Sequence, residues 1–344
     1  MNLTRKQFRS KALLYRCLHN SSVQCNTCWH KCIIKEGGHG RCKTRINIRG
    51  TLFTETYGMI STLSLNPIEK KPLFHYYPGS YALTIGSIGC NFSCPWCQNW
   101  SISKCYPSEV HYPRFMSPTD LVNRTEKNDK ISGISISFNE PTLSLEYSLD
   151  VFHQCKPKTY RMFVTNGYMT SQALKLLIKA GMSGMTVTVK GSKKTVKQYC
   201  KTNVEKVWEN IRTAFEKGVH IEVVCLIIPT VNDSIEFYHE VAIRLRDINS
   251  NIPLHFTRFH PDYQFTNVDS TPIKTLEVAH GTAQSEGLSY VYLGNVPGHP
   301  LENTYCPNCQ TLLIKRTIYQ IDMKYDVKTQ RCPSCGTSIP IFLG

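Results

Sequence analysis

The middle of the chain alternates short, β-branched apolar runs with longer segments whose apolar residues recur at helical spacing. The apolar runs predict strands at 81–86, 131–138, 161–165, 185–189, 220–228, 253–259 and 288–293. The amphipathic segments predict helices at 118–127, 143–154, 171–180, 204–217, 234–248 and 273–285. Nearly continuous apolar strands that alternate with helices are typical of a parallel sheet. We therefore expect an α/β protein built on a partial or full β/α barrel of six to eight strands.

Cysteine usage divides the 344 residues into three parts. We expect a cysteine-rich N-terminal region at 1–78, the barrel core at 79–301 and a second cysteine-rich region at 302–344. No run of eighteen apolar residues occurs and no apolar signal segment follows Met1, so we expect a cytoplasmic protein without a membrane span. In a reducing compartment, the sixteen clustered cysteines are expected to bind metals rather than to form disulfides.

Cys90, Cys94 and Cys97 form a C-x3-C-x2-C motif directly after the first predicted barrel strand. Loops at this end of barrel strands carry the chemistry of barrel enzymes. A structural zinc site is closed by four ligands, whereas three cysteines leave one coordination position of a metal cluster open. A chance arrangement or a zinc knuckle is the alternative, and the strand before the motif makes it the weaker one.

This motif, with Trp96 before its third cysteine, resembles the signature of the radical S-adenosylmethionine (SAM) superfamily. The resemblance implies that the three cysteines hold a [4Fe-4S] cluster and that SAM binds its open iron. It also implies an oxidoreductase-like enzyme that cleaves SAM reductively and abstracts a hydrogen atom. Trp96 is then expected to pack on the adenine. We also expect a flavodoxin- or ferredoxin-type electron donor and anaerobic conditions.

Four further residues at predicted strand ends are candidate SAM contacts. Superfamily members usually carry a glycine-glycine-glutamate motif that contacts the methionine ammonium group, and this chain keeps only its Glu-Pro half, at Glu140. Asn166 follows the third strand in a Thr-Asn-Gly turn, which lies by the cofactor pocket in related activating enzymes. Lys190 resembles a lysine that holds the SAM carboxylate in activating enzymes, and His260 could bind the ribose. Structural readings remain for three of them: a helix N-terminal acid for Glu140, a turn for Asn166 and a solvated side chain for Lys190.

Six blocks from about Val23 to the C-terminus resemble one family within this superfamily. They are residues 25–42, 89–100, 139–141, 258–263 and 294–298, and the two C-terminal cysteine pairs. Together they resemble the radical enzyme of the AmmeMemoRadiSam system, a relative of pyruvate formate-lyase activating enzymes. The resemblance implies Memo-like and Ammecr-type partner proteins. It does not identify the acceptor of the radical, which is the molecule from which the hydrogen atom is abstracted.

The outer cysteines form two further sets of four. Cys306, Cys309, Cys332 and Cys335 are arranged as C-x2-C-x22-C-x2-C, which predicts a zinc ribbon. Cys25, Cys28, Cys32 and Cys42 have uneven spacing. We expect zinc there first, with an auxiliary iron-sulfur cluster as the alternative, and His30 could replace one of the cysteines.

The formal net charge of +15 leaves several acceptors open. Bound metal-thiolate centres would lower the charge to about +10, which still suits an acidic partner. The acceptor could be a glycine of a partner protein, as in glycyl-radical-enzyme activation, or RNA, or a small metabolite. The non-catalytic alternative is a zinc-dependent protein that binds nucleic acid on an inactive barrel.

Overall fold

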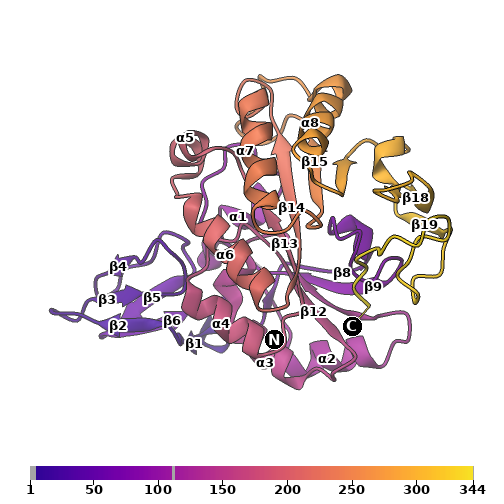
Figure 1. Ribbon diagram of the computed structural model, residues 1–344. Helices are drawn as coiled ribbons and strands as arrows, with labels where there is room; N and C mark the ends of the chain where they lie inside the picture. The colour runs from indigo at the N-terminus through magenta and orange to yellow at the C-terminus, as the bar shows by residue number, and fades with distance from the viewer. Residues whose placement is uncertain (1–4, 111–112, 344) are drawn as a thin grey trace.

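A central sheet of eight strands organises the computed structural model, which describes residues 5–110 and 113–343 (Figure 1). Its order is β16-β15-β14-β13-β12-β11-β9-β8, and every pair except β8–β9 is parallel. The strands are β8 (Thr62–Pro67), β9 (Tyr81–Gly86), β11 (Gly133–Ile136), β12 (Tyr160–Thr165), β13 (Gly184–Thr188), β14 (His220–Ile227), β15 (Leu254–Arg258) and β16 (Val291–Gly294). The seven parallel strands confirm the sequence prediction. Over the described residues the edge strands β8 and β16 do not pair, so the sheet is open.

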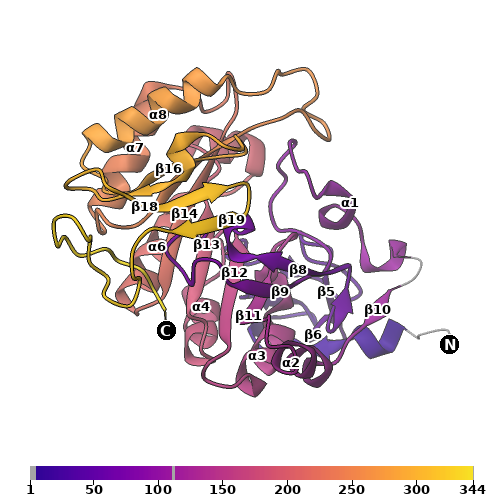
Figure 2. The same ribbon diagram turned by 90° about the vertical axis from the view of Figure 1, so that its right-hand side faces the viewer.

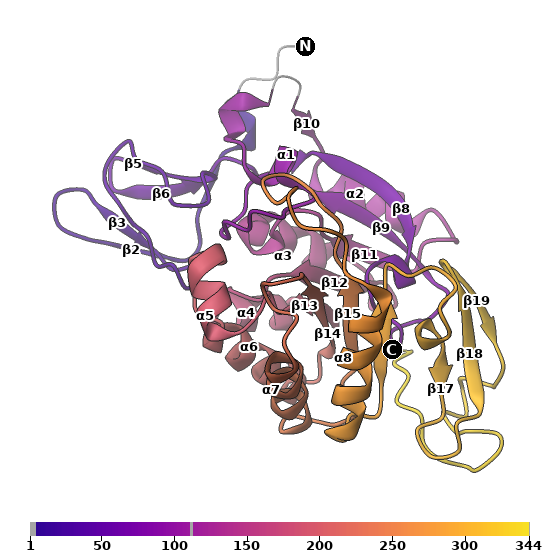
Figure 3. The same cartoon turned by 90° about the horizontal axis from the view of Figure 1, so that it is seen from above.

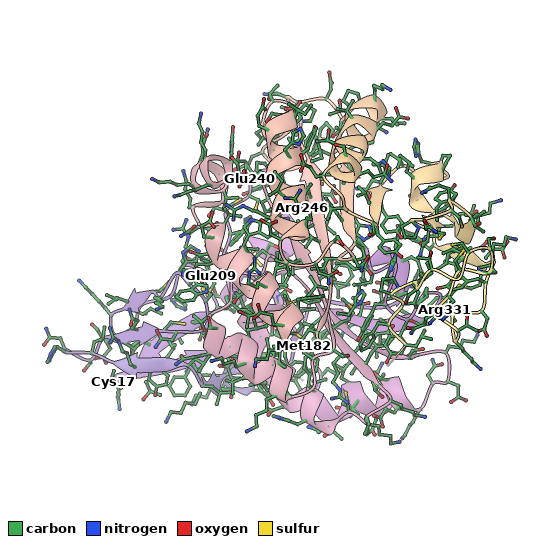
Figure 4. The ribbon with its side chains drawn as sticks, in the orientation of Figure 1. Cys17, Met182, Glu209, Glu240, Arg246 and Arg331 are labelled. Atoms are coloured by element: carbon green, nitrogen blue, oxygen red, sulfur yellow. The ribbon has the colours of Figure 1, made fainter. Side chains whose placement is uncertain are left out.

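Helices connect the parallel strands and lie side by side along one face of the sheet, as the view from above shows for α4, α6, α7 and α8 (Figure 3). The principal helices are α2 (Pro118–Glu126), α3 (Leu145–Gln154), α4 (Ser171–Lys179), α6 (Glu205–Glu216), α7 (Ile235–Arg246) and α8 (Ile273–Ser285). Ser117, Thr170 and Ser234 cap three of them by accepting a backbone N–H bond. Exposed charges such as Glu209 and Arg246 cover the outer side of this layer (Figure 4).

The main hydrophobic core lies between this sheet and its helices. Fully buried strand residues such as Ile134, Phe163 and Val223 pack against helix residues such as Leu177 and Ile211. The periodic apolar pattern of the sequence therefore corresponds to one continuous core.

The N-terminal cysteine-rich module consists of two small three-stranded sheets that project from one side of the molecule (Figure 1) and therefore lie on the far side in Figure 2. Their strands are β1 (Ser10–Lys11), β2 (Tyr15–Cys17), β3 (Val23–Cys25), β4 (Ile33–Ile34), β5 (Arg45–Ile48) and β6 (Thr51–Thr54). A further short pair joins β7 (Met59–Ile60) to β10 (Arg114–Phe115).

One buried ion pair fixes this module to the core. Arg45 donates two hydrogen bonds, of 2.7 and 2.8 Å, to the carboxylate of Glu146 at the start of α3. Arg45 also donates to the Leu143 carbonyl, and the backbone N–H of Leu13 donates to Glu146. The module is therefore held by charge-assisted bonds away from solvent.

The C-terminal ribbon lies on the opposite side of the sheet from this module (Figure 3). It contains β17 (Thr304–Tyr305), β18 (Leu312–Thr317) and β19 (Gln320–Met323) around a small core of its own. Buried Arg316 joins it to the rest by donating to the Phe74 carbonyl at 2.9 Å. The division of the chain at residues 78 and 301 stays a prediction, and β8 adds a strand from the first region to the central sheet. No helix among the described residues is long and apolar enough to cross a bilayer.

Candidate active site

The carboxyl ends of the parallel strands border an open cleft of about 480 Å³. Cys90, Cys94 and Cys97, in the loop after β9, all line it. Glu140 and Asn166 reach the same cleft after β11 and β12. The arrangement brings the predicted cluster ligands together with other candidate cofactor residues at the functional end of the sheet.

The loop that carries the three cysteines begins at a glycine with no room for a side chain. Gly89 has φ +80°, and a Cβ there would lie 2.4 Å from Thr44 Cγ2 and 2.8 Å from the Cys42 carbonyl oxygen. Asn139 fixes the same turn by accepting from the Ser87 N–H and by donating to the carbonyls of Ile88 and Gly89. The loop is therefore positioned both by the N-terminal module and by the turn after β11.

The thiols of Cys94 and Cys90 have shifted pKa values. A hydrogen bond with Cys200, whose Sγ lies 3.5 Å from that of Cys94, lowers the pKa of Cys94 to about 6, and Lys190 adds to the effect. Burial raises the pKa of Cys90 to about 12, so a metal has to displace its proton.

The donor set fits a cluster better than a single ion. Three thiols line the cleft, yet over the described residues the only group of three or more ligand atoms within 4.8 Å of one another is the C-terminal set. The Cys90, Cys94 and Cys97 sulfurs are thus too far apart to converge on one zinc ion, whose bonds to sulfur are about 2.3 Å long. An iron-sulfur cluster, with a separate iron for each thiolate, suits this wider spacing.

Cys200 is a neighbour that the sequence did not reveal. It ends the π-helical turn Val196–Cys200, which follows the short helix α5 (Lys193–Thr195). Its side chain is fully buried and is not part of the cleft lining. The fourth thiol therefore lies beside Cys94 without facing the open side of the site.

Glu140 joins the loops after β11 and β12 through its hydrogen bonds. Its Oε1 accepts from the Thr142 backbone N–H, from the Thr142 hydroxyl and from the Thr165 hydroxyl, and its Oε2 accepts from the Asn166 N–H at 2.8 Å. Burial raises its pKa, and these hydrogen bonds oppose the rise. The carboxylate is buried, and only Oε2 has acceptor capacity to spare for a ligand.

The remaining predicted contacts differ in how they meet the cleft. Asn166 donates to Asn91 at 2.7 Å beside the first cysteine, and half-buried Lys190 lines the cleft after β13. Trp96 is buried against Tyr199 and also lines the cleft. His260 is exposed, accepts from the Gln98 amide at 2.6 Å and lies outside the lining residues.

Lysines that the sequence did not single out also border the cleft. Lys71 is buried, and this burial lowers its pKa to about 7. Lys70 and Lys104 join it and Lys190, whereas Glu140 is the one acidic residue of the described lining. Tyr319, from the turn between β18 and β19, completes the rim. Segments distant in sequence supply these residues, so no local pattern could have predicted them.

The two outer cysteine sets differ in geometry. The sulfurs of Cys306, Cys309, Cys332 and Cys335 lie within 4.8 Å of one another, and this group could hold a metal ion. Cys25, Cys28, Cys32 and Cys42 instead line a separate small cavity. His30 lines that cavity too, but its Nε2 lies 2.7 Å from the Asn91 carbonyl oxygen.

Comparison with known proteins settles the family. Residues 84–241 match the model of the radical SAM superfamily. An uncharacterized protein of Methanocaldococcus jannaschii is 42% identical over 336 residues, which cover 97% of this chain and 99% of that protein. The chain belongs to the radical SAM superfamily. Membership implies SAM and an iron-sulfur cluster as its cofactors.

More distant similarities cover only part of this radical SAM protein. The GTP 3',8-cyclase of Aliarcobacter butzleri is 26% identical over 150 residues, which are 42% of this chain and 45% of the cyclase. A domain of pyruvate-formate lyase-activating enzyme from Bacteroides vulgatus superposes with a TM-score of 0.41 and 14% identity. That superposition covers 48% of this chain and 99% of the domain.

Proposed function

We propose that this protein is a radical SAM enzyme that abstracts a hydrogen atom from an anionic acceptor. One observation carries the proposal: the three motif cysteines and four lysines line the same cleft. Cys90, Cys94 and Cys97 would hold the cluster. When bound, the cluster supplies the electron that cleaves SAM to methionine and a 5'-deoxyadenosyl radical.

The side chains of the cleft position and enclose the cofactor. Glu140 holds the loops after β11 and β12 in register, and its Oε2 offers an acceptor to the methionine ammonium group. Lys190, beside Cys94, offers a positive charge to the methionine carboxylate. Buried Trp96 gives the site an apolar wall that excludes water from a reactive radical. His260 holds Gln98 at the rim.

The charge of the cleft favours an anionic acceptor. A lysine with a pKa near 7 gains a proton when an anion binds beside it, because the anion stabilises the charged form. Lys70 and Lys104 extend this positive lining. A phosphorylated or carboxylated small molecule fits it best, and RNA would share the same attraction. A neutral backbone glycine of a partner enzyme would not use these charges.

Partners and place in the cell remain part of the proposal. The six sequence blocks that resemble the AmmeMemoRadiSam enzymes support Memo-like and Ammecr-type partners, with the acceptor delivered by one of them. A flavodoxin- or ferredoxin-type protein in the cytoplasm would supply the electron. Glycyl-radical-enzyme activation is the second candidate, and the Cys90 motif is equally compatible with it.

The first test is anaerobic SAM cleavage. The protein is reconstituted with iron and sulfide and reduced with dithionite, and 5'-deoxyadenosine is measured beside the Cys94→Ala variant. We expect the wild-type protein to form 5'-deoxyadenosine and the Cys94→Ala variant to form none. A protein that carries only zinc would overturn the proposal in favour of the nucleic-acid-binding alternative.

The charge argument has its own test with tripolyphosphate as the probe. We expect tripolyphosphate to inhibit SAM cleavage by the wild-type protein. Lys71→Met should raise the inhibition constant of tripolyphosphate about tenfold, equivalent to about 1.4 kcal/mol. Lys179→Met, which removes an exposed lysine of α4, is the matched control and should behave as wild type. Equal inhibition of all three proteins would contradict an anionic acceptor in the cleft.

A further inference from the structure

The N-terminal cysteines differ from the ribbon cysteines in a way that identifies their cofactor. We propose that Cys25, Cys28, Cys32 and Cys42 hold a second [4Fe-4S] cluster rather than zinc. The proposal replaces zinc, which the sequence favoured, and it is independent of what the Cys90 cluster does.

The spacing of the sulfurs carries the argument. Four thiolates on one zinc ion lie about 3.8 Å apart, because each bond is about 2.3 Å and the geometry is tetrahedral. The ribbon sulfurs meet this requirement, since they all lie within 4.8 Å of one another. No three of the N-terminal sulfurs, which all belong to described residues, do so. In a [4Fe-4S] cluster each thiolate binds its own iron at a corner of a cube, so the sulfurs stand farther apart.

The sulfurs of the Cys90 motif provide a reference for the arrangement of cysteines around a cluster. Cys90, Cys94 and Cys97 carry the radical SAM motif, and membership of the superfamily implies a cluster there. Over the described residues these three sulfurs also fail to form a close group. The N-terminal set therefore resembles the cluster site, and differs from the ribbon, in having no three sulfurs within 4.8 Å of one another.

The surroundings of the N-terminal sulfurs also suit a cluster. The four cysteines line one small cavity, and three of them are buried. Two of the ribbon cysteines, in contrast, are exposed. Buried Arg45 lines the cavity and places a positive charge near the thiolates, and Thr44 Oγ1 lies 3.3 Å from Cys42 Sγ. Burial, charge and hydrogen bonds to sulfur are the means by which proteins tune iron-sulfur centres.

The cavity also borders the loop of the first cluster. Asn91, next to Cys90, lines the N-terminal cavity, and a neighbouring cavity is lined by both Cys42 and Cys90. Two clusters in these places would be close enough for their unpaired electrons to interact when both are reduced.

The test is metal analysis of a variant that lacks the first cluster. Cys90→Ala, Cys94→Ala and Cys97→Ala are combined, and the full chain is reconstituted anaerobically with iron and sulfide. We expect about four irons and four sulfides per chain to remain, with the Mössbauer spectrum of a [4Fe-4S]²⁺ centre. Adding Cys28→Ala and Cys42→Ala should remove this iron. Adding Cys17→Ala, an exposed cysteine of the same module, should not.

The alternatives give different results. No iron in the triple variant, with zinc or no metal at the N-terminal site, would overturn the proposal whether or not the wild type cleaves SAM. Circular dichroism checks that each variant is folded. If the variant with Cys28→Ala and Cys42→Ala does not fold, Cys32→Ala replaces that pair, because Cys32 is only half-buried. In reduced wild type we expect electron paramagnetic resonance signals broader than the sum of the two single-cluster proteins. A simple sum would overturn the adjacent placement.

Discussion

Whether Cys200 is a ligand of the cluster can be tested directly by mutation. Its Sγ lies 3.5 Å from that of Cys94, but it does not line the cleft. We expect Cys200→Ala to keep the change that SAM causes in the electron paramagnetic resonance spectrum of the reduced protein. Cys94→Ala should lose that change, because it removes a cluster ligand.

The control for this comparison is Cys225→Ala, which truncates another fully buried cysteine. It reports the effect of a small cavity alone, about 1 kcal/mol of stability. Loss of the SAM-dependent change in Cys200→Ala, but not in Cys225→Ala, would make Cys200 a cluster ligand and contradict this assignment.

At the residue scale, sequence predicts sites whose members lie close together in the chain. Cys90, Cys94 and Cys97 are spaced within one loop, so their motif is readable directly. Lys71 and Cys200 come from other segments and reach the site only through tertiary packing. The position of His260 at a strand end was predicted, but the direction of its side chain depends on Gln98 and could not be.

At the scale of elements, the contact between β5 and α3 holds the N-terminal module in place. Arg45 and Glu146 are both almost fully buried. Arg45→Met leaves the Glu146 carboxylate buried without its partner, so we expect a loss of about 3–5 kcal/mol in the free energy of unfolding. Chemical denaturation measures the loss, and hydrogen exchange of β5 and β6 locates it.

Arg244→Met provides the matched comparison. Arg244 joins α7 to α6 through Glu205, but both side chains are about one-third exposed. Such a pair is worth about 1 kcal/mol or less. Equal losses in the two variants would show that the buried pair does not anchor the module.

The elements that sequence predicted are those with a regular apolar period. All seven parallel strands pack into the main core, so their buried runs are continuous. Strand β8 was missed because most of its side chains are half-buried at the sheet edge. The strands of the N-terminal module are two to four residues long, which is too short for a period to register.

At the scale of the whole molecule, a buried histidine links three parts of the fold. His75 donates from Nδ1 to the Pro340 carbonyl and accepts at Nε2 from the Tyr292 hydroxyl, while its backbone N–H donates to Glu222. Burial lowers the pKa of His75 to about 3. Burial alone would raise the pKa of Glu222, but hydrogen bonds from His220 and His255 hold it below its usual range.

Both groups make the fold sensitive to acid. Below pH 6.5 the unfolded chain takes up a proton at His75 that the folded chain does not, so stability falls as the pH drops toward 3. The contribution of Glu222 is present above its unfolded pKa of about 4.3 and is lost below it, in the same direction. Between pH 7 and 5 we expect His75 to account for a loss of about 2 kcal/mol.

Denaturation of wild type and His75→Asn at pH 7, 6 and 5 measures this contribution. Asparagine can still donate to Pro340 but does not titrate, so the variant should lose about 2 kcal/mol less than wild type over this interval. Metal ligands are the same in both proteins, so their protonation cancels in the difference. Parallel pH dependences would contradict the assignment to His75.

The turn that carries Tyr319 has a consequence for biosynthesis. Tyr319 forms part of the cleft rim, and Arg316 beside it is fixed to Phe74. During translation the Cys90 loop leaves the ribosome long before this turn. A nascent chain therefore carries the Cys90 loop while part of the rim of its cleft is still missing. The rim of the cleft is thus complete only after residue 319 has left the ribosome and β18 and β19 have paired.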